Sequence, residues 1–225
     1  MSLNKQLREI AQTYHPNPFH NWNHGKYVWN TVMNLEKSRS VVTPWRMAWY
    51  FHDADHRWFV QEDDEERAAQ IAHDTLHKWG FWKDFIDATK IRIMWTVFKE
   101  RWNLILPEQK LIADADLSKL WSGYIHFVQN SIRYLLETEK KWDISDERIA
   151  EFFRIDQPWF FKYLTSISRR PETPFLTPIA QKRFPNFSRN IDNMAKDAEE
   201  NIWELTSLVR TFEKKPEIKT FRNAA

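Results

Sequence analysis

The sequence contains no cysteine, and only three of its 225 residues are glycine. Without cysteine the chain forms neither a disulfide nor a thiolate metal site, so a bound metal would need His, Asp, Glu or water as ligands. Three glycines are too few for the glycine-rich loops that hold phosphates in P-loop and dinucleotide-binding proteins. These absences exclude two common ways of binding a nucleotide and restrict the metal chemistry.

Long apolar runs and a strong net charge are also missing. No stretch approaches the roughly 18 apolar residues of a membrane span, and the start "MSLNKQLREI" lacks the apolar region of a secretion signal. The net charge is +2, from 33 basic and 31 acidic residues, so the chain lacks the basic field of a dedicated nucleic-acid binder. We expect a cytoplasmic protein whose partners are neither membranes nor nucleic acids.

The residues that are present indicate an all-α chain. Hydrophobic residues make up 42% and charged residues 28%, which is the balance of a globular protein. Scarce glycine, few alternating patterns and apolar residues at helical spacing favour helices over strands. We predict a single all-α domain over 1–225, with its core at about 14–165, an extended loop at 170–188 and a C-terminal helix at 189–213.

Capping signals place several helix boundaries. Thr43 followed by Pro44 predicts a helix start, and Gly80 predicts a helix end. Ser188 is expected to open the last helix. Further helices are expected at 3–14, 22–36, 83–100, 107–121, 122–141 and 145–164.

Imidazole and carboxylate side chains lie on or beside several of these predicted helices. They are His24, the adjacent His52 and Asp53, and the pair Asp114 and Asp116 in "IADADL". Helix bundles build metal sites from side chains that several facing helices project inward. A mixed nitrogen and oxygen ligand set suits Mn, Fe, Co, Ni or Zn better than Mg. The sequence therefore predicts a divalent metal site, with both Asp114 and Asp116 open as ligands.

The order His, then His-Asp, then Asp resembles the HD superfamily of metal-dependent phosphohydrolases, which are all-helical. The chain also looks like one bacterial and phage-type subgroup of that superfamily, whose motifs it matches from about residue 14 to 208. The matching stretches are "FHNWNH" at 19–24, "FHD" at 51–53, "DEERAA" at 64–69 and "DADL" at 114–117. The resemblance implies an HD-type helical bundle around a metal-binding cleft. By this pattern the metal ligands are His24, His52, Asp53 and Asp116, with Asp114 the competing choice for the last.

The resemblance further implies metal-dependent hydrolysis of a small phosphorylated substrate, with a nucleotide or deoxynucleotide the first class to test. A bound divalent ion lowers the pKa of water and offsets the negative charge of a phosphate. Asp53 is expected to orient the attacking water, and Glu65 to transfer a proton to the leaving oxygen. The residues expected to bind substrate are His20, Asn21, Arg67, Lys119 and Arg133, the three basic ones as phosphate clamps.

Two departures from the family patterns bear on the chemistry. Phe98 and Lys99 stand where the subgroup has a His, which favours one metal ion over two. The acidic pair that follows His-Asp in alarmone hydrolases is missing, which argues against that substrate. The alternatives are a cyclic nucleotide phosphodiesterase, a di-iron oxygenase of the HD type, which the missing His disfavours, and a ligand-binding module without turnover.

Other conspicuous residues have a simpler structural interpretation. Asp55 and His56 are expected to mark the polar end of a helix, and His20 either approaches the metal or substrate or holds its loop. The stretch "HDTLH" at 73–77 has the two-His spacing of zinc proteases, but Asp74 replaces their Glu and no third ligand follows. Most of the 13 tryptophans are expected in the core. Those near the site that could stack a base are Trp22, Trp49, Trp58 and Trp95.

Overall fold

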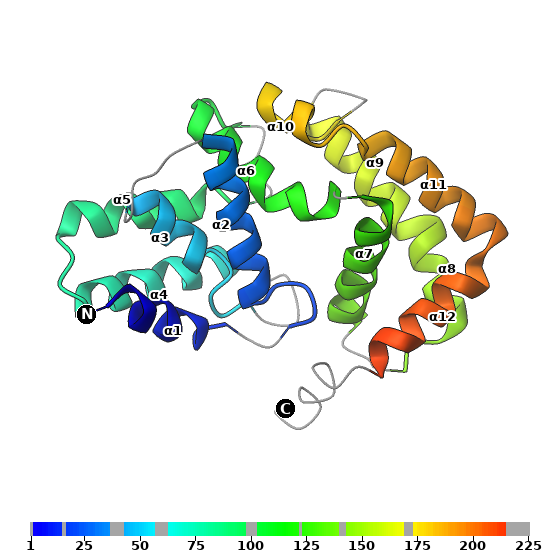
Figure 1. Cartoon of the computed structure of the whole chain (residues 1–225), viewed down its shortest axis with the longest axis horizontal. Coiled ribbons are helices and arrows are strands. Elements are labelled where there is room, and N and C mark those ends of the chain that lie inside the picture. The colour runs from blue at the N-terminus through cyan, green and yellow to red at the C-terminus, as the bar shows by residue number, and fades with distance from the viewer. Residues whose placement is uncertain are drawn as a thin grey trace. The chain divides into compact units, whose positions relative to one another are not determined.

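The computed structural model describes residues 2–14, 17–36, 43–56, 63–97, 103–121, 123–139, 143–168 and 173–214. In this part of the chain every regular element is a helix and none is a strand (Figure 1). No helix there is both long enough and apolar enough to cross a membrane. The predicted all-α class is confirmed.

The chain divides into two compact units, Met1–Lys119 and Leu120–Ala225. The first unit holds α1 (Leu3–Ala11), α2 (Trp22–Glu36), α3 (Pro44–Phe51), α4 (Asp64–Lys78), α5 (Lys83–Met94) and α6 (Pro107–Leu117). The 3-10 helix η2 (Ser118–Trp121) spans the boundary, and the second unit holds α7 (Tyr124–Glu139), α8 (Asp146–Glu151), the π-helix η3 (Phe152–Asp156), α9 (Gln157–Ser168), α10 (Pro178–Arg183), α11 (Phe187–Glu200) and α12 (Ile202–Glu213). One HD-type domain over 1–225 stays a prediction.

Helix α3 begins where the capping signal predicts. The Thr43 side chain accepts the backbone N–H of Arg46 at 3.3 Å, and Pro44 occupies the first position of the helix. The helix ends at Phe51, so His52 and Asp53 lie just beyond its C-terminus.

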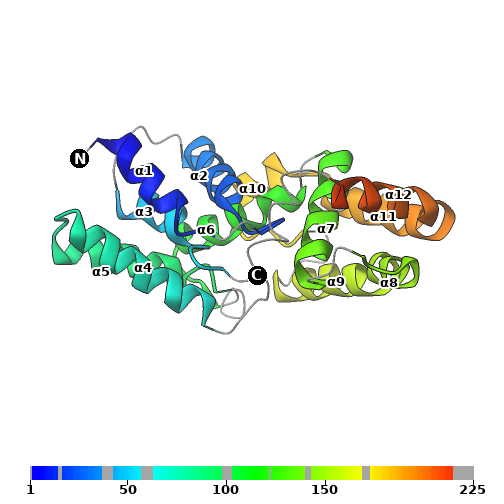
Figure 2. The ribbon, with the colours of Figure 1, turned by 90° about the horizontal axis from the view of Figure 1, so that it is seen from below.

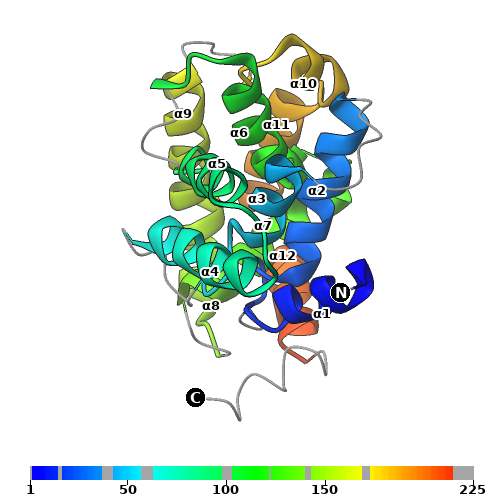
Figure 3. The ribbon, with the colours of Figure 1, turned by 90° about the vertical axis from the view of Figure 1, so that its left-hand side faces the viewer.

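Both sides of α3 are buried, and Figure 3 shows the helix between α2 and α5. Trp49 packs with Val28 and Ile112 in one apolar cluster. Met47 and Phe51 belong to a second cluster that includes residues of α4 and α5. Because the helix is covered on both sides, the residues that follow its end emerge inside the first unit.

Helix α4 lies alongside α5 (Figure 2), and it buries one stripe of small and apolar residues. Ala68, Ala72 and Leu76 are fully buried, and the small alanines let the neighbouring helix come close. The helix stops before Gly80, whose φ of 82° is in the left-handed region that favours glycine.

The second unit differs from the predicted pattern near its end. The helix expected at 189–213 is two helices, α11 and α12, which are separated at Asn201. Helix α10 falls inside the segment expected as an extended loop. Its start repeats the signal of α3, since the Thr177 side chain accepts the backbone N–H of Ala180 at 3.3 Å and Pro178 takes the first position. The three other prolines of this segment concealed the signal in the sequence.

Gly25 allows the first turn of α2, which carries His24, to pack closely against its neighbours. A Cβ atom at Gly25 would lie 2.8 Å from the Tyr14 hydroxyl oxygen and 3.6 Å from the Trp49 carbonyl oxygen. That hydroxyl is held in place, because it is buried and donates to the Tyr50 carbonyl at 2.7 Å. The absence of a side chain at Gly25 thus helps His24 approach the end of α3.

We expect Gly25→Ala to destabilise the protein. Alanine gains roughly 1 kcal/mol of helix propensity over glycine, but the overpacking against Tyr14 costs about 1–3 kcal/mol. The measurement is the free energy of unfolding in urea. Gly123→Ala is the matched control, because a Cβ there meets nothing within 4 Å. The substitution at Gly25 should cost less in a Tyr14→Phe background, and an equal cost in both backgrounds would contradict this account.

Candidate metal centre

Asn21 forms the N-terminal cap that positions His24 in the first turn of α2. The Asn21 Oδ1 atom accepts the backbone N–H groups of Asn23 at 2.9 Å and His24 at 3.2 Å. Its Nδ2 donates to the carbonyls of Asn17 at 2.8 Å and Pro18 at 3.2 Å. Its amide therefore fixes the loop to the helix, and the role of Asn21 in binding substrate stays a prediction.

His52 is oriented by the last turn of α3. Its Nδ1 donates to the Trp49 carbonyl at 2.9 Å, which leaves Nε2 to face the interior. Histidines that bind metals are commonly fixed by such a hydrogen bond from the other ring nitrogen to a carbonyl or carboxylate. The orientation of His52 is therefore compatible with its predicted role as a metal ligand.

Helices α2, α3 and α6 bring the four predicted ligands together. The His24 Nε2 atom lies 3.0 Å from Asp116 Oδ1 and 3.4 Å from Asp53 Oδ2. The His52 Nε2 atom lies 3.1 Å from Asp53 Oδ2 and 3.4 Å from Asp116 Oδ1. Both histidines and Asp53 are buried, whereas the Asp116 side chain is 28% exposed. Asp114, which is fully buried on the same helix, remains the competing choice for the fourth ligand.

These residues fit a divalent cation. His24, His52 and Asp53 each offer a ligand atom, and these atoms lie within 4.8 Å of one another. Ligand atoms about 2.1 Å from one ion are separated by roughly 3.0–3.4 Å, which is the range of the four measured distances. His52 Nε2 and Asp53 Oδ2 are buried and have no hydrogen-bond partner among the described residues. Two buried polar atoms that lie 3.1 Å apart without a hydrogen bond could share a bound cation.

The pKa values of the four groups reflect burial and mutual pairing. Burial lowers the pKa of His24 to about 4, although Asp116 and Asp53 oppose this shift. Burial also acts to lower the pKa of His52, but the charges of Asp53 and Asp116 outweigh it and raise the value well above its usual range. For both carboxyl groups burial acts to raise the pKa, while the imidazoles lower it below the ordinary value. Mutual attraction therefore shifts His52 and the two carboxyl groups toward their charged forms.

Glu65, in the first turn of α4, is electrostatically coupled to the same cluster. Burial raises its pKa to about 7, and repulsion from the negative charges of Asp53, Asp64 and Asp116 adds to the shift. A carboxyl group with a pKa near neutrality can both donate and accept a proton under physiological conditions. This property suits the proton transfer expected of Glu65.

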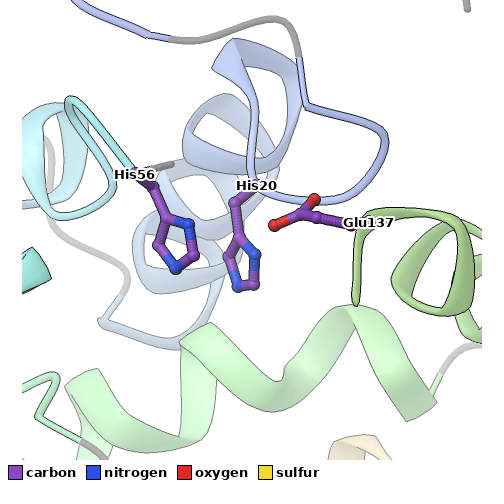
Figure 4. A group of neighbouring side chains, drawn as sticks. All are labelled: His20, His56 and Glu137. Carbon is purple, nitrogen blue, oxygen red and sulfur yellow. The ribbon is translucent and has the colours of Figure 1, made fainter. Parts of the chain in front are cut away.

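His20 and His56 form a stacked imidazole pair beside the cluster (Figure 4). Their ring centroids are 4.0 Å apart and the planes are inclined by 13°. The His20 ring also meets the His24 ring edge to face, with centroids 5.7 Å apart. The pair therefore lies next to a candidate metal ligand.

The expectation that Asp55 and His56 mark the polar end of a helix is wrong. Helix α3 already ends at Phe51, and His56 is buried at 7% exposure. Its Nε2 lies 3.5 Å from the Asp64 carboxylate. The signal in the sequence was the repeated His-Asp pattern of "HDADH", whose second half had no recognisable partner because these contacts are with distant residues.

Arg67 lies among three carboxylates. Its Nε donates to Asp55 Oδ2 at 3.2 Å, and its two terminal nitrogens bind Asp63 and Asp64. The guanidinium group thus uses all three of its nitrogens on acidic side chains of its own unit.

The other two predicted phosphate clamps have different surroundings. Lys119 lies with its Nζ 5.0 Å from the Phe19 ring centroid, and its positive charge contributes to the lowered pKa of His24. Arg133 belongs to the second unit, where it donates to Asn130 Oδ1 at 3.0 Å and lies over the Phe212 ring. Of the three predicted clamps, Lys119 is the one whose charge contributes to the pKa of a residue in the cluster.

The remaining sequence features lie away from the cluster or in the core. His73 and His77 stack on each other on the outer face of α4, away from the buried cluster. Trp49 is fully buried, and Trp22 stacks on Tyr50. Trp58, Phe98 and Lys99 lie outside the described residues.

Two crystal structures of one type of domain are similar to this protein. Both are of the phosphodiesterase domain of the rhodopsin phosphodiesterase from the choanoflagellate Salpingoeca rosetta. One has a TM-score of 0.55 at 15% identity and covers 99% of this chain and 83% of that one. The other has a TM-score of 0.57 at 16% identity and covers 95% of this chain and 85% of that one.

The chain has the fold of a phosphodiesterase domain. This supports the phosphohydrolase-like fold that the motif resemblance implies. No protein-family profile and no curated protein sequence matches the chain.

We expect His52→Ala and Asp53→Ala to abolish binding of a divalent ion, because each removes a ligand atom from the buried cluster. Metal bound per chain, measured by elemental analysis after dialysis against Mn or Zn, checks this. The double variant His73→Ala and His77→Ala is the control, since it removes two imidazoles from the surface of the same unit. Metal retained by His52→Ala, or lost from the control, would contradict the assignment.

We also expect Zn to lower the pKa of Glu65. In the metal-free protein the negative charges of Asp53 and Asp116 contribute to its value of about 7. A cation that offsets those charges favours the ionised carboxylate, so the pKa falls while burial continues to oppose ionisation. The carboxyl ¹³C shift of Glu65, followed by NMR against pH with and without Zn, measures the change. An unchanged or raised pKa would show that the cation does not bind beside Asp53 and Asp116.

Proposed function

We propose that this protein is a metal-dependent hydrolase of phosphate esters. The observation that carries the proposal is the buried cluster of His24, His52, Asp53 and Asp116, whose distances and unpartnered atoms suit one divalent cation. The similarity of the fold to phosphodiesterase domains supports the same reaction class. The mixed nitrogen and oxygen ligands favour Mn, Co, Ni, Fe or Zn over Mg.

The cluster and the residues near it have defined tasks in this proposal. A divalent cation held by the cluster would lower the pKa of water and offset the charge of the phosphate. The Asp53 carboxylate accepts a hydrogen bond from the attacking water and so orients it. Glu65, whose pKa burial raises, donates a proton to the leaving oxygen. Lys119 attracts the phosphate, because its charge already acts on the cluster.

The substrate that we propose first is a nucleotide or deoxynucleotide, cleaved at a phosphate monoester. A cyclic nucleotide, cleaved at a phosphodiester, is the second candidate, and the phosphodiesterase name of the two similar structures favours it. The same ligand cluster and proton donor serve both reactions. The two reactions differ in where the leaving oxygen ends. In a monophosphate it leaves with the nucleoside, whereas in a cyclic nucleotide it stays on the same molecule as the phosphate.

A substrate screen tests the proposal. The metal-loaded protein is incubated with nucleoside and deoxynucleoside monophosphates, and in parallel with cyclic nucleotides, and the products are separated by chromatography. We expect one class to be hydrolysed with Mn or Co, and His52→Ala to have no activity. Glu65→Gln should keep its metal and lose roughly 10²–10⁴-fold in kcat, the usual contribution of general acid catalysis.

Other outcomes of the screen identify other functions. Two irons per chain with oxygen uptake would indicate an oxygenase of the di-iron type. Tight binding of a nucleotide without turnover would indicate a ligand-binding module. Activity that His52→Ala retains would overturn the proposed role of the cluster.

A further inference from the structure

The turn that follows His52 and Asp53 contains a backbone conformation that side-chain-bearing residues rarely adopt. Asp55 has a φ of 61°, in the left-handed region. Its backbone N–H donates to the Thr13 carbonyl at 2.9 Å, and the N–H of His56 donates to the Asp53 carbonyl at 3.1 Å. His56, the residue that follows this turn, is buried. A conformation of this kind persists only where the surrounding structure holds it.

Arg67, on α4, contacts this turn directly through Asp55 and indirectly through Asp64. Its Nε donates to the carboxylate of Asp55, the residue with the unusual backbone, at 3.2 Å. One of its terminal nitrogens binds Asp64 Oδ1, while Asp64 Oδ2 lies 3.5 Å from His56 Nε2. Asp64 is 4% exposed, so its bond with the guanidinium is shielded from water and strengthened. One guanidinium therefore holds both the turn and the carboxylate that faces the next imidazole.

His56 connects the turn to the candidate metal centre through its own contacts. Its carbonyl accepts the Asn17 side-chain amide at 2.5 Å, and its ring stacks on His20 (Figure 4). The His20 ring then meets the His24 ring edge to face. A contiguous set of contacts thus runs from Arg67 through Asp64, His56 and His20 to a predicted metal ligand.

We propose that Arg67 is a positioning residue, which by binding Asp55 and Asp64 holds the turn after Asp53 so that His56 packs against His20 beside the metal ligands. This differs from the phosphate clamp that the sequence suggests for Arg67. A clamp presents free N–H groups to its ligand, whereas the three nitrogens of Arg67 bind carboxylates. The effect on catalysis rests on the phosphohydrolase function proposed above.

A double-mutant cycle with Arg67→Ala and His56→Ala tests the proposal. We expect Arg67→Ala to keep its metal and to lose about 10–100-fold in kcat/KM, as is usual when a supporting residue is removed from a metal site. If Arg67 acts through His56, the double variant loses no more than the more impaired single variant. If Arg67 binds the substrate phosphate directly, the two losses multiply, and the proposal is overturned.

Rescue at Asp55 provides a second and independent arm. Glycine adopts a φ of 61° without strain, so Asp55→Gly should keep most of the activity and reduce the loss caused by Arg67→Ala. Lys83→Ala is the control, because it breaks an exposed ion pair with Asp87 in the same unit. An undiminished loss in the Asp55→Gly background would contradict the role of Arg67 in holding the turn. Should Arg67→Ala fail to fold, Arg67→Lys takes its place in both arms, with a smaller expected loss.

A readout that needs no substrate separates this proposal from the proposed function. Nuclear Overhauser contacts between the ring protons of His20 and His56 should be present in the wild type and weakened or lost in Arg67→Ala. If the wild type hydrolyses none of the substrates and these contacts still depend on Arg67, the proposed function fails while the positioning role stands. If the contacts persist in Arg67→Ala, the positioning role is refuted, whatever the activity.

Discussion

Placing two imidazoles and two carboxylates together inside the protein is the constraint on which the first unit depends. Each group loses hydration there, which is unfavourable unless another polar group or ion replaces the water. His24, His52, Asp53 and Asp116 partly replace it for one another, and this explains why all four have displaced pKa values. The burial of α3 on both sides and the missing side chain at Gly25 serve the same end, since they let the ligand-bearing segments converge.

A second set of charged groups supports the first. The acidic start of α4 supplies Asp63 and Asp64 to Arg67 and presents Glu65 to the cluster. The two halves of "HDADH" therefore differ in function. Its first half supplies predicted metal ligands, and its second half, Asp55 and His56, connects those ligands to α4. A single short turn thereby connects the candidate metal centre to the helix that carries the proposed proton donor.

The sequence was sufficient for features that depend on local rules. Thr43 and Pro44 placed the start of α3 because capping needs only neighbouring residues. The four motifs, in order, predicted which histidines and carboxylates would meet, although only the fold shows that His24 and Asp116 lie 3.0 Å apart. The stacking of His56 on His20 was missed, because it requires a left-handed φ at Asp55 that no local signal specifies. The binding of Arg67 to carboxylates was missed for a similar reason. The sequence does not indicate whether a basic side chain will face a carboxylate or a substrate.

The charge balance of the cluster indicates which kind of ion it can bind. Mutual attraction lowers the pKa of both carboxyl groups and raises that of His52, while burial lowers the pKa of His24. Two carboxylates in a largely buried place are unfavourable unless positive charge offsets them. A divalent cation bound in place of a proton on His52 would offset the two carboxylates and give Nε2 of His52 and Oδ2 of Asp53 a common partner. Charge and hydrogen bonding thus point to the same occupant, and binding of that cation would be coupled to release of a proton.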